Sequence, residues 1–210
     1  MSGYNHNGQN HRMRIVLTGG PGGGKTTAAD LFRREIGDEV TVVPEAATML
    51  FSGGFPRVDQ GDARRATQRA IYNVQRNLED VQAALYPGRI LLCDRGTLDG
   101  AAYWPDGADA FYQDLNTSVE KEYARYDAVI HFESAAVGDM DIEGGNPVRI
   151  ESAEAAVALD ARLRAVWSAH PRFVMVPHNP SFFKKITFGL ASIESIVSQL
   201  RAAHREPKDG

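Results

Sequence analysis

The stretch RIVLTGGPGGGKTTAADLF, residues 14–32, combines three features in a fixed order. An apolar run with β propensity comes first, a glycine-rich loop follows, and a helix-favouring segment begins at Lys25. Gly19, Gly24, Lys25 and Thr26 satisfy the pattern G-x-x-x-x-G-K-[ST] of phosphate-binding loops. Glycines let successive backbone N–H groups turn inward around phosphate oxygens, where side chains would collide. The stretch therefore predicts a site for a nucleoside triphosphate.

The residues of this loop have distinct expected roles. The loop amides and the positive end of the following helix would surround the phosphates. Lys25 would reach the β- and γ-phosphates, and the Thr26 hydroxyl would bind Mg²⁺, so ATP and Mg²⁺ are the expected cofactors. The predicted nucleotide-binding residues here are Gly19, Gly20, Pro21, Gly22, Gly23, Gly24, Lys25, Thr26 and Thr27.

Short β-rich runs alternate with helical patterns along the whole chain. We expect strands at 14–18, 39–43, 89–93, 127–132 and 172–176, and helices at 25–36, about 62–85, 109–125, 151–169 and 180–203. The strand runs show little polar alternation, which is typical of strands covered on both faces. The pattern predicts an α/β fold, a three-layer P-loop NTPase domain with a parallel five-stranded sheet. We expect this single domain over 13–204, a disordered arm over 1–12 and a flexible tail over 205–210.

Composition restricts the partners and the compartment. The 210 residues carry a formal net charge of −4, which argues against a nucleic-acid partner held by a broad basic surface. The single cysteine, Cys93, excludes an internal disulfide, and its apolar neighbours predict a buried thiol. No segment has the ~20 apolar residues of a membrane span, and the first residues lack the apolar core of a signal peptide. These observations favour a cytoplasmic protein.

A second motif, RILLCDRG, ends a predicted strand with Asp94, where a carboxylate lies near Mg²⁺ in related sites. Arg95 stands in the next position, where many ATPases have a glutamate that activates water. The N-K-x-D guanine signature of switch GTPases is absent from the sequence. The motif therefore favours phosphoryl transfer to an acceptor over hydrolysis, although Asp94 and Arg95 forming only structural pairs is the alternative.

A third motif, VTVVPEAAT, places Glu45 directly after the second predicted strand. In open α/β sheets the carboxyl ends of strands line the ligand crevice. An acid there can accept the proton of an attacking hydroxyl and orient it toward the γ-phosphate. The alternative is that Glu45 begins a helix and interacts only with its dipole.

These motifs resemble the P-loop kinase superfamily, in which deoxynucleoside kinases use a glutamate after strand two and an acid–arginine pair after strand three. More closely, five segments are similar to the AAA-type ATPase domain shared by the nicotinamide-riboside-kinase part of NadR proteins and a group of nucleotide-binding trafficking factors. The segments are LTGGPGGGKTT, VPEAAT, CDRGTLD, VRIESAEAAVALD and PHNPSFFKKI, and the resemblance covers about residues 13–200. It implies a strand order of 2-3-1-4-5 and leaves the acceptor open.

The resemblance also implies a lid and a base-binding loop. Arg149 is the expected lid arginine that contacts the transferring phosphoryl group, with Arg162 and Arg164 as weaker candidates; surface pairing with a nearby glutamate is the alternative. Asn179 is the expected contact to the nucleotide base, with Lys184 or Lys185 covering it. Ser181 as a simple helix cap is the alternative reading of that loop.

The acceptor side has two further candidates. Gln75 lies where related kinases border the acceptor pocket, and a solvated helix residue is the alternative. Tyr103 and Trp104 would form either an aromatic wall or part of the core.

The leading function is ATP- and Mg²⁺-dependent phosphoryl transfer to a small hydroxyl acceptor, such as a nucleoside or a related metabolite. The predicted catalytic residues are Lys25, Glu45, Asp94, Arg95 and Arg149, and the predicted metal ligands are Thr26 and Asp94. A nucleotide-binding regulatory protein that acts on a protein partner is the alternative.

Overall fold

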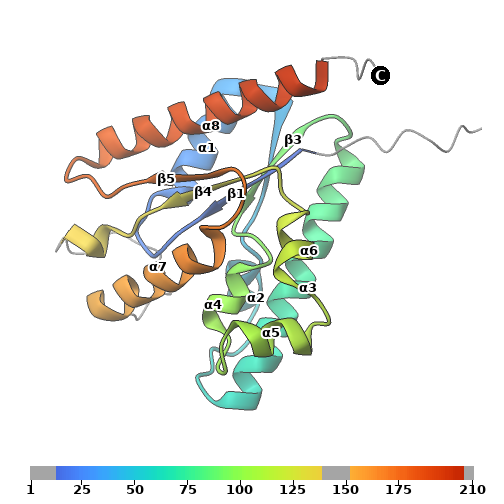
Figure 1. The fold of residues 1–210 in the computed structure, drawn as a ribbon, viewed down its shortest axis with the longest axis vertical. Helices are drawn as coiled ribbons and strands as arrows, with labels where there is room; N and C mark the ends of the chain where they lie inside the picture. Colours follow the sequence, from blue (N-terminus) through green and yellow to red (C-terminus); the bar gives the residue numbers. More distant parts are fainter. Residues whose placement is uncertain (1–12, 139–151, 206–210) are drawn as a thin grey trace, which may run out of the picture.

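Five parallel strands form one sheet in the order β2-β3-β1-β4-β5 in the computed structural model, which describes residues 13–138 and 152–205 (Figure 1). The strands are β1 (Arg14–Thr18), β2 (Val40–Val43), β3 (Ile90–Asp94), β4 (Ala128–Phe132) and β5 (Phe173–Val176). The sheet and its order are as predicted, and each strand end lies within one residue of its expected position.

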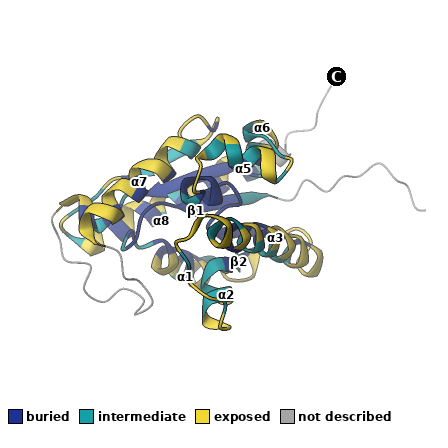
Figure 2. Cartoon of the chain, turned by 90° about the horizontal axis from the view of Figure 1, so that it is seen from below, coloured by how far each residue is buried: buried dark blue, intermediate teal, exposed yellow. Residues whose placement is uncertain are grey.

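Helices cover both faces of the sheet, so the domain has three layers (Figures 1 and 2). One face is covered by α1 (Lys25–Ile36) and α8 (Phe182–Arg205), and the other by α3 (Gly61–Leu85), α5 (Ala108–Asp114) and α7 (Ala153–Trp167). The remaining helical segments are η1 (Gly37–Glu39), α2 (Ala46–Ser52), α4 (Asp99–Tyr103), α6 (Val119–Tyr123) and η2 (Ala135–Gly138). Within the described part of the chain, none of the helices carries an apolar stretch that could span a bilayer.

Strand β1 has no polar face because its side chains alternate between two covered faces of the sheet. Ile15 and Leu17 pack with residues of α1 and α8. Val16 packs in the opposite layer, with Trp167 of α7 and with residues of α3 and α5. Successive side chains of a strand point to opposite faces, and both faces here are covered. Figure 2 shows the resulting buried sheet between helices whose outer sides are exposed.

The prediction of one continuous helix over 109–125 is wrong, because the segment forms two short helices, α5 and α6. Asn116 between them has a left-handed φ of 50°. The Ser118 side chain then accepts a hydrogen bond from the Lys121 N–H and caps α6. The short helix α2 begins directly after Glu45, as the alternative interpretation of that residue had it, whereas α4 was not expected as a separate element.

Candidate active site

The glycine-rich loop connects β1 to α1 at the carboxyl end of the sheet. Gly19 has a φ of 123°, and a Cβ there would lie 2.0 Å from the Phe132 carbonyl oxygen on β4. Gly24 has a φ of 90° and precedes the first residue of α1. Lys25 is buried, and its ammonium group donates hydrogen bonds to the carbonyl oxygens of Gly19 at 2.9 Å and Gly20 at 2.8 Å. The strand, loop and helix thus stand in the order that the motif predicts.

The two predicted metal ligands lie together. The Thr26 hydroxyl, on the first turn of α1, donates to Oδ2 of Asp94 at the end of β3, at 2.6 Å. Burial and the nearby Glu45 raise the pKa of Asp94, and Lys25, Thr26 and Arg95 oppose this rise. A hydroxyl and a carboxylate oxygen are the hard oxygen ligands that Mg²⁺ prefers, so this pair fits the ion.

Arg95 joins the three predicted motifs. Its Nη1 donates to the Gly19 carbonyl oxygen at 2.8 Å, and its Nε lies 3.3 Å from Oε1 of Glu45. Arg95 has a left-handed φ of 78°, a strained conformation for a residue with a side chain. Burial alone would lower its pKa, but the groups of Tyr103, Glu45, Asp99 and Asp94 raise it, so the guanidinium stays charged.

Asp99 is a member of this cluster that sequence reasoning missed. Its carboxylate lies 3.2 Å from Nη1 of Arg95 and accepts hydrogen bonds from the Thr18 hydroxyl at 2.9 Å and the Trp167 indole N–H at 2.5 Å. No motif marks Asp99: it is the first residue of α4, and Arg95 precedes that helix with a left-handed backbone, so the contact depends on the turn between them.

Asp160 is a second missed residue, and it holds the loop from the side of α7. Its Oδ1 accepts the Gly20 N–H at 2.6 Å and the Ser134 N–H at 3.0 Å, and its Oδ2 lies 3.2 Å from Nε2 of His131. The Ser134 hydroxyl also donates to the Pro21 carbonyl oxygen at 2.7 Å. The loop is therefore fixed to β4 and α7 by buried polar contacts.

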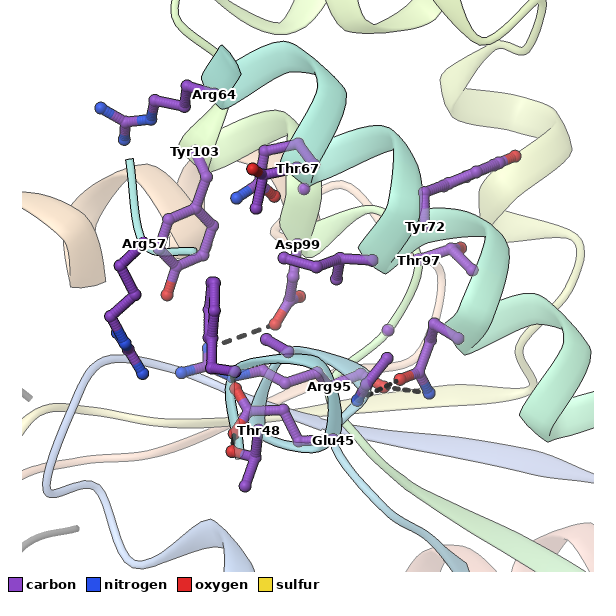
Figure 3. Close-up of a pocket in the computed structure, with 18 of the residues that line it drawn as sticks. Glu45, Thr48, Arg57, Arg64, Thr67, Tyr72, Arg95, Thr97, Asp99 and Tyr103 are labelled. Carbon is purple, nitrogen blue, oxygen red and sulfur yellow. Dashed lines mark hydrogen bonds and ion pairs between the residues drawn. The ribbon is translucent and has the colours of Figure 1, made fainter. Parts of the chain in front are cut away.

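A cavity of about 330 Å³ lies beside the loop, between α2, α3 and α4 (Figure 3). Glu45 and Arg95 line it together with Pro21 of the glycine-rich loop. Its other walls include Thr48, Phe51, Arg57, Arg64, Gln68, Ile71, Tyr72, Thr97, Asp99 and Tyr103. This volume falls in the range of small-molecule sites, and the wall mixes apolar surface with a few polar groups.

Of the residues expected near the acceptor, Gln75 and Tyr103 line the cavity and Trp104 does not. Gln75 lines the cavity but is not solvated: its Oε1 accepts the Ala46 N–H at 3.2 Å and its Nε2 donates to the Arg95 carbonyl oxygen at 3.2 Å. Gln75 thus connects α2, α3 and the Arg95 backbone. Tyr103 lines the cavity, whereas Trp104 is buried in the core.

The loop after β5 shows the helix-capping contacts. Asn179 Oδ1 accepts the Ser181 N–H at 2.9 Å, and the Ser181 hydroxyl accepts the Lys184 N–H at 3.3 Å. Lys184 is exposed, whereas Lys185 is buried and donates to the Glu133 carbonyl oxygen. The capping reading of Ser181 is correct, and base binding by Asn179 stays a prediction.

The three lid candidates suggested by the sequence are Arg149, Arg162 and Arg164. Arg149 lies outside the described residues, and its role stays a prediction. Arg162 donates from Nε to the Ala102 carbonyl oxygen at 3.1 Å, and both Arg162 and Arg164 are exposed.

Two other residues singled out in the sequence are Thr27 and Cys93. Thr27 is exposed on the first turn of α1. Cys93 is buried as predicted, and burial raises the pKa of its thiol.

Comparison with solved structures finds the same fold in nucleoside and nucleotide kinases. Deoxyadenosine kinase from M. mycoides with bound dATP is 15% identical, with a TM-score of 0.61 over 87% of this chain and 100% of that one. Thymidylate kinase from Ehrlichia chaffeensis is 16% identical, with a TM-score of 0.58 over 89% of this chain and 98% of that one. At these identities the likeness establishes the fold.

Comparison with curated proteins finds no significant match. Among protein-family models, the one described as AAA domain matches residues 14–182, which include the glycine-rich loop, Glu45, Asp94 and Asp160. This match spans most of the sequence and agrees with the resemblance drawn from its motifs. The chain therefore belongs to the AAA domain family, with the fold of nucleoside and nucleotide kinases.

Proposed function

We propose that the protein transfers the γ-phosphoryl group of ATP to the hydroxyl of a small acceptor bound in the cavity beside the glycine-rich loop. The observation that carries this proposal is the shared position of Glu45 and Arg95. Both line the cavity, and Arg95 also contacts the loop through the Gly19 carbonyl oxygen. This arrangement supports a base and a cation that act where the bound phosphates and the acceptor would meet.

Glu45 is the proposed general base. Its Oε2 accepts a hydrogen bond from the Thr48 hydroxyl at 2.6 Å, and its Oε1 faces the Arg95 guanidinium, so the carboxylate is held in one orientation. Its side chain is 19% exposed, which leaves a surface that an acceptor hydroxyl can reach. The acceptor oxygen forms a bond to the γ-phosphorus while the bond to the bridging oxygen breaks. The proton passes to Glu45, and ADP leaves with the electron pair.

The other residues bind and neutralise the phosphates. The loop amides and Lys25 hold the triphosphate, and Thr26 and Asp94 would hold Mg²⁺, which supplies charge neutralisation when bound. Arg95 is placed to stabilise charge on the transferring group, and Arg149 is proposed to add a second cation. The neighbours with this fold support the proposal because their names describe a deoxyadenosine kinase and a thymidylate kinase.

The test is Mg²⁺-dependent ADP release from ATP, measured with a panel of nucleosides and related hydroxyl compounds. Wild type is compared with Glu45→Gln, which keeps the size of the side chain and removes the base. We expect one compound class to stimulate ADP release and Glu45→Gln to lose at least 100-fold in kcat while retaining ATP binding. Lys25→Ala should weaken ATP binding itself. ATP binding without stimulation by any compound would overturn the kinase proposal and favour the regulatory alternative.

A further inference from the structure

Two arginines on the wall of the cavity differ from the other arginines around them. Arg57 and Arg64 line the cavity, and neither forms an ion pair with a carboxylate of the described residues. On α3, Arg65 pairs with Asp106 at 3.1 Å and Arg69 pairs with Asp114 at 2.9 Å. Farther along α3, Arg76 donates to the Tyr72 hydroxyl at 3.1 Å and, like Arg64, has no carboxylate partner among the described residues. Of these four α3 arginines, Arg64 is the one that lines the cavity.

Arg57 is held over the cavity by an aromatic ring. Its guanidinium carbon lies 4.2 Å from the centroid of the Phe51 ring, a cation–π geometry, and Phe51 lines the same cavity. In Figure 3, Arg57 and Arg64 lie toward the same side of the cavity as the ring of Tyr103, whereas Glu45 and Arg95 lie toward another part of it. Stacking on Phe51 leaves the N–H groups of Arg57 available to a ligand.

The wall of the cavity also contains the amide of Gln68, a largely buried side chain on α3. Gln68 is 8% exposed and lines the cavity, and its side chain makes no hydrogen bond to another described residue. Its neighbours on α3 differ in this respect, because Thr67 donates to the Ala63 carbonyl oxygen and Gln75 is bonded to Ala46 and Arg95. Gln68 is therefore suited to a polar group of the acceptor.

The distribution of charge determines where an anionic part of the acceptor can lie. In the proposed function, the part of the cavity beside Glu45 and Arg95 takes the acceptor hydroxyl and the γ-phosphoryl group, so a further anionic group of the acceptor has to lie elsewhere in the cavity. Near Arg57 and Arg64 two cations face one carboxylate, Asp59, which pairs with neither of them. Arginine forms strong, often bidentate, hydrogen bonds to phosphate and carboxylate groups.

We propose that the acceptor carries an anionic group, a phosphate or a carboxylate, at the end remote from its reacting hydroxyl. Arg57 and Arg64 bind the anion, Gln68 hydrogen bonds to a polar group in the middle of the molecule, and the hydroxyl lies at Glu45. This inference rests on the proposed function and narrows its substrate class from hydroxyl compounds in general to anionic ones.

The test compares matched pairs of acceptors in the ADP-release assay. Each pair contains a neutral hydroxyl compound and its counterpart with a phosphate or a carboxylate, for example nucleosides against nucleoside 3′-monophosphates and sugars against sugar monophosphates or sugar acids. We expect kcat/KM to be at least 30-fold higher for the anionic member, and the phosphate and carboxylate arms identify which anion is bound. If neutral members are used equally well, the inference is wrong and the proposed function stands. If no compound stimulates ADP release, both are wrong.

Variants test whether Arg57 and Arg64 cause the preference for an anionic acceptor. We expect Arg57→Ala and Arg64→Ala each to raise KM for the anionic acceptor about tenfold or more, with KM for ATP changed less than twofold. Arg65→Ala is the matched control, since Arg65 is on the same helix, pairs with Asp106 and does not line the cavity. It should leave both KM values unchanged. An equal rise in KM for ATP in the Arg57 and Arg64 variants would show that they serve the donor phosphates and would overturn the inference.

Discussion

The carboxylate of Asp160 on α7 accepts the backbone N–H of Gly20 at 2.6 Å, across 140 residues of sequence. The same oxygen accepts the Ser134 N–H, so one buried side chain fixes the glycine-rich loop relative to the end of β4. A loop that binds phosphate through backbone amides depends on the position of its backbone. We therefore infer that Asp160 is a positioning residue for the nucleotide site.

Asp160→Ala should leave the N–H groups of Gly20 and Ser134 buried and unpaired, because both donate to the lost carboxylate. At about 1–3 kcal/mol for each unpaired group, with partial relaxation, we expect a loss of roughly 2–4 kcal/mol in the free energy of unfolding. ATP affinity should fall as well, since the loop is released. Urea unfolding and nucleotide titration measure the two effects. The control is Glu154→Ala, an exposed acid on the same helix, which should change stability by less than about 0.5 kcal/mol.

The stability that Asp160 provides should depend on pH in a defined direction. Burial alone would raise its pKa, but the hydrogen bond and charge of His131 and the N–H groups of Gly20 and Ser134 outweigh burial and lower it. Because the pKa is lower in the folded state, the stabilisation is fully present above the unfolded value of about 3.9 and is lost as the pH falls through the folded value. The stability difference between wild type and Asp160→Asn should shrink as the pH falls below about 4. A difference that grows as the pH falls from about 4 to 2 would contradict this account.

Arg95→Lys should be a severe change although it keeps the charge. One guanidinium contacts Glu45, Asp99 and the Gly19 carbonyl oxygen at once, and an ammonium group on a flexible stem cannot hold these three partners in one geometry. We expect kcat to fall about 100-fold in the acceptor-stimulated reaction.

The control for Arg95 is a partly buried arginine outside the cavity. Arg125 pairs with the buried Glu79 at 2.7 Å and does not line the cavity. Arg125→Lys should lower stability and leave kcat within about threefold of wild type. If both variants reduce kcat equally, the role of Arg95 is structural.

The sequence predicted the fold because its signals are local. The apolar run of β1, the left-handed glycines and the start of α1 at Lys25 are adjacent in the chain, and each strand is a short apolar run. The break between α5 and α6 was missed because the apolar residues of 109–125 fit one helix, and the left-handed turn at Asn116 has no proline or glycine to mark it.

The site was predictable only where a motif names the residue. Lys25, Glu45, Asp94 and Arg95 lie in motifs and meet at the carboxyl end of the sheet. Asp160 acts through a contact 140 residues distant, which no pattern within a segment reveals. Gln75 is another such case, because only the folded structure shows that its amide is occupied by Ala46 and Arg95 while Gln68 is not.

Gly19 and Gly37 both have a positive φ, but an added Cβ would clash with another strand only at Gly19. Substituting each by alanine therefore separates the cost of backbone strain from the cost of a steric clash. Gly37, after α1, has a φ of 67° and a ψ of −132°, and beyond its chain neighbours no atom lies within 4 Å of an added Cβ, so Gly37→Ala should lose only the conformational term of about 1–3 kcal/mol. At Gly19 the φ is 123° and an added Cβ would lie 2.0 Å from the backbone oxygen of Phe132, which cannot move without disturbing β4. We expect Gly19→Ala to lose about 3–5 kcal/mol in urea unfolding and to abolish ATP binding. Equal losses in the two variants would mean that close packing of the loop against β4 does not determine the choice of glycine at position 19.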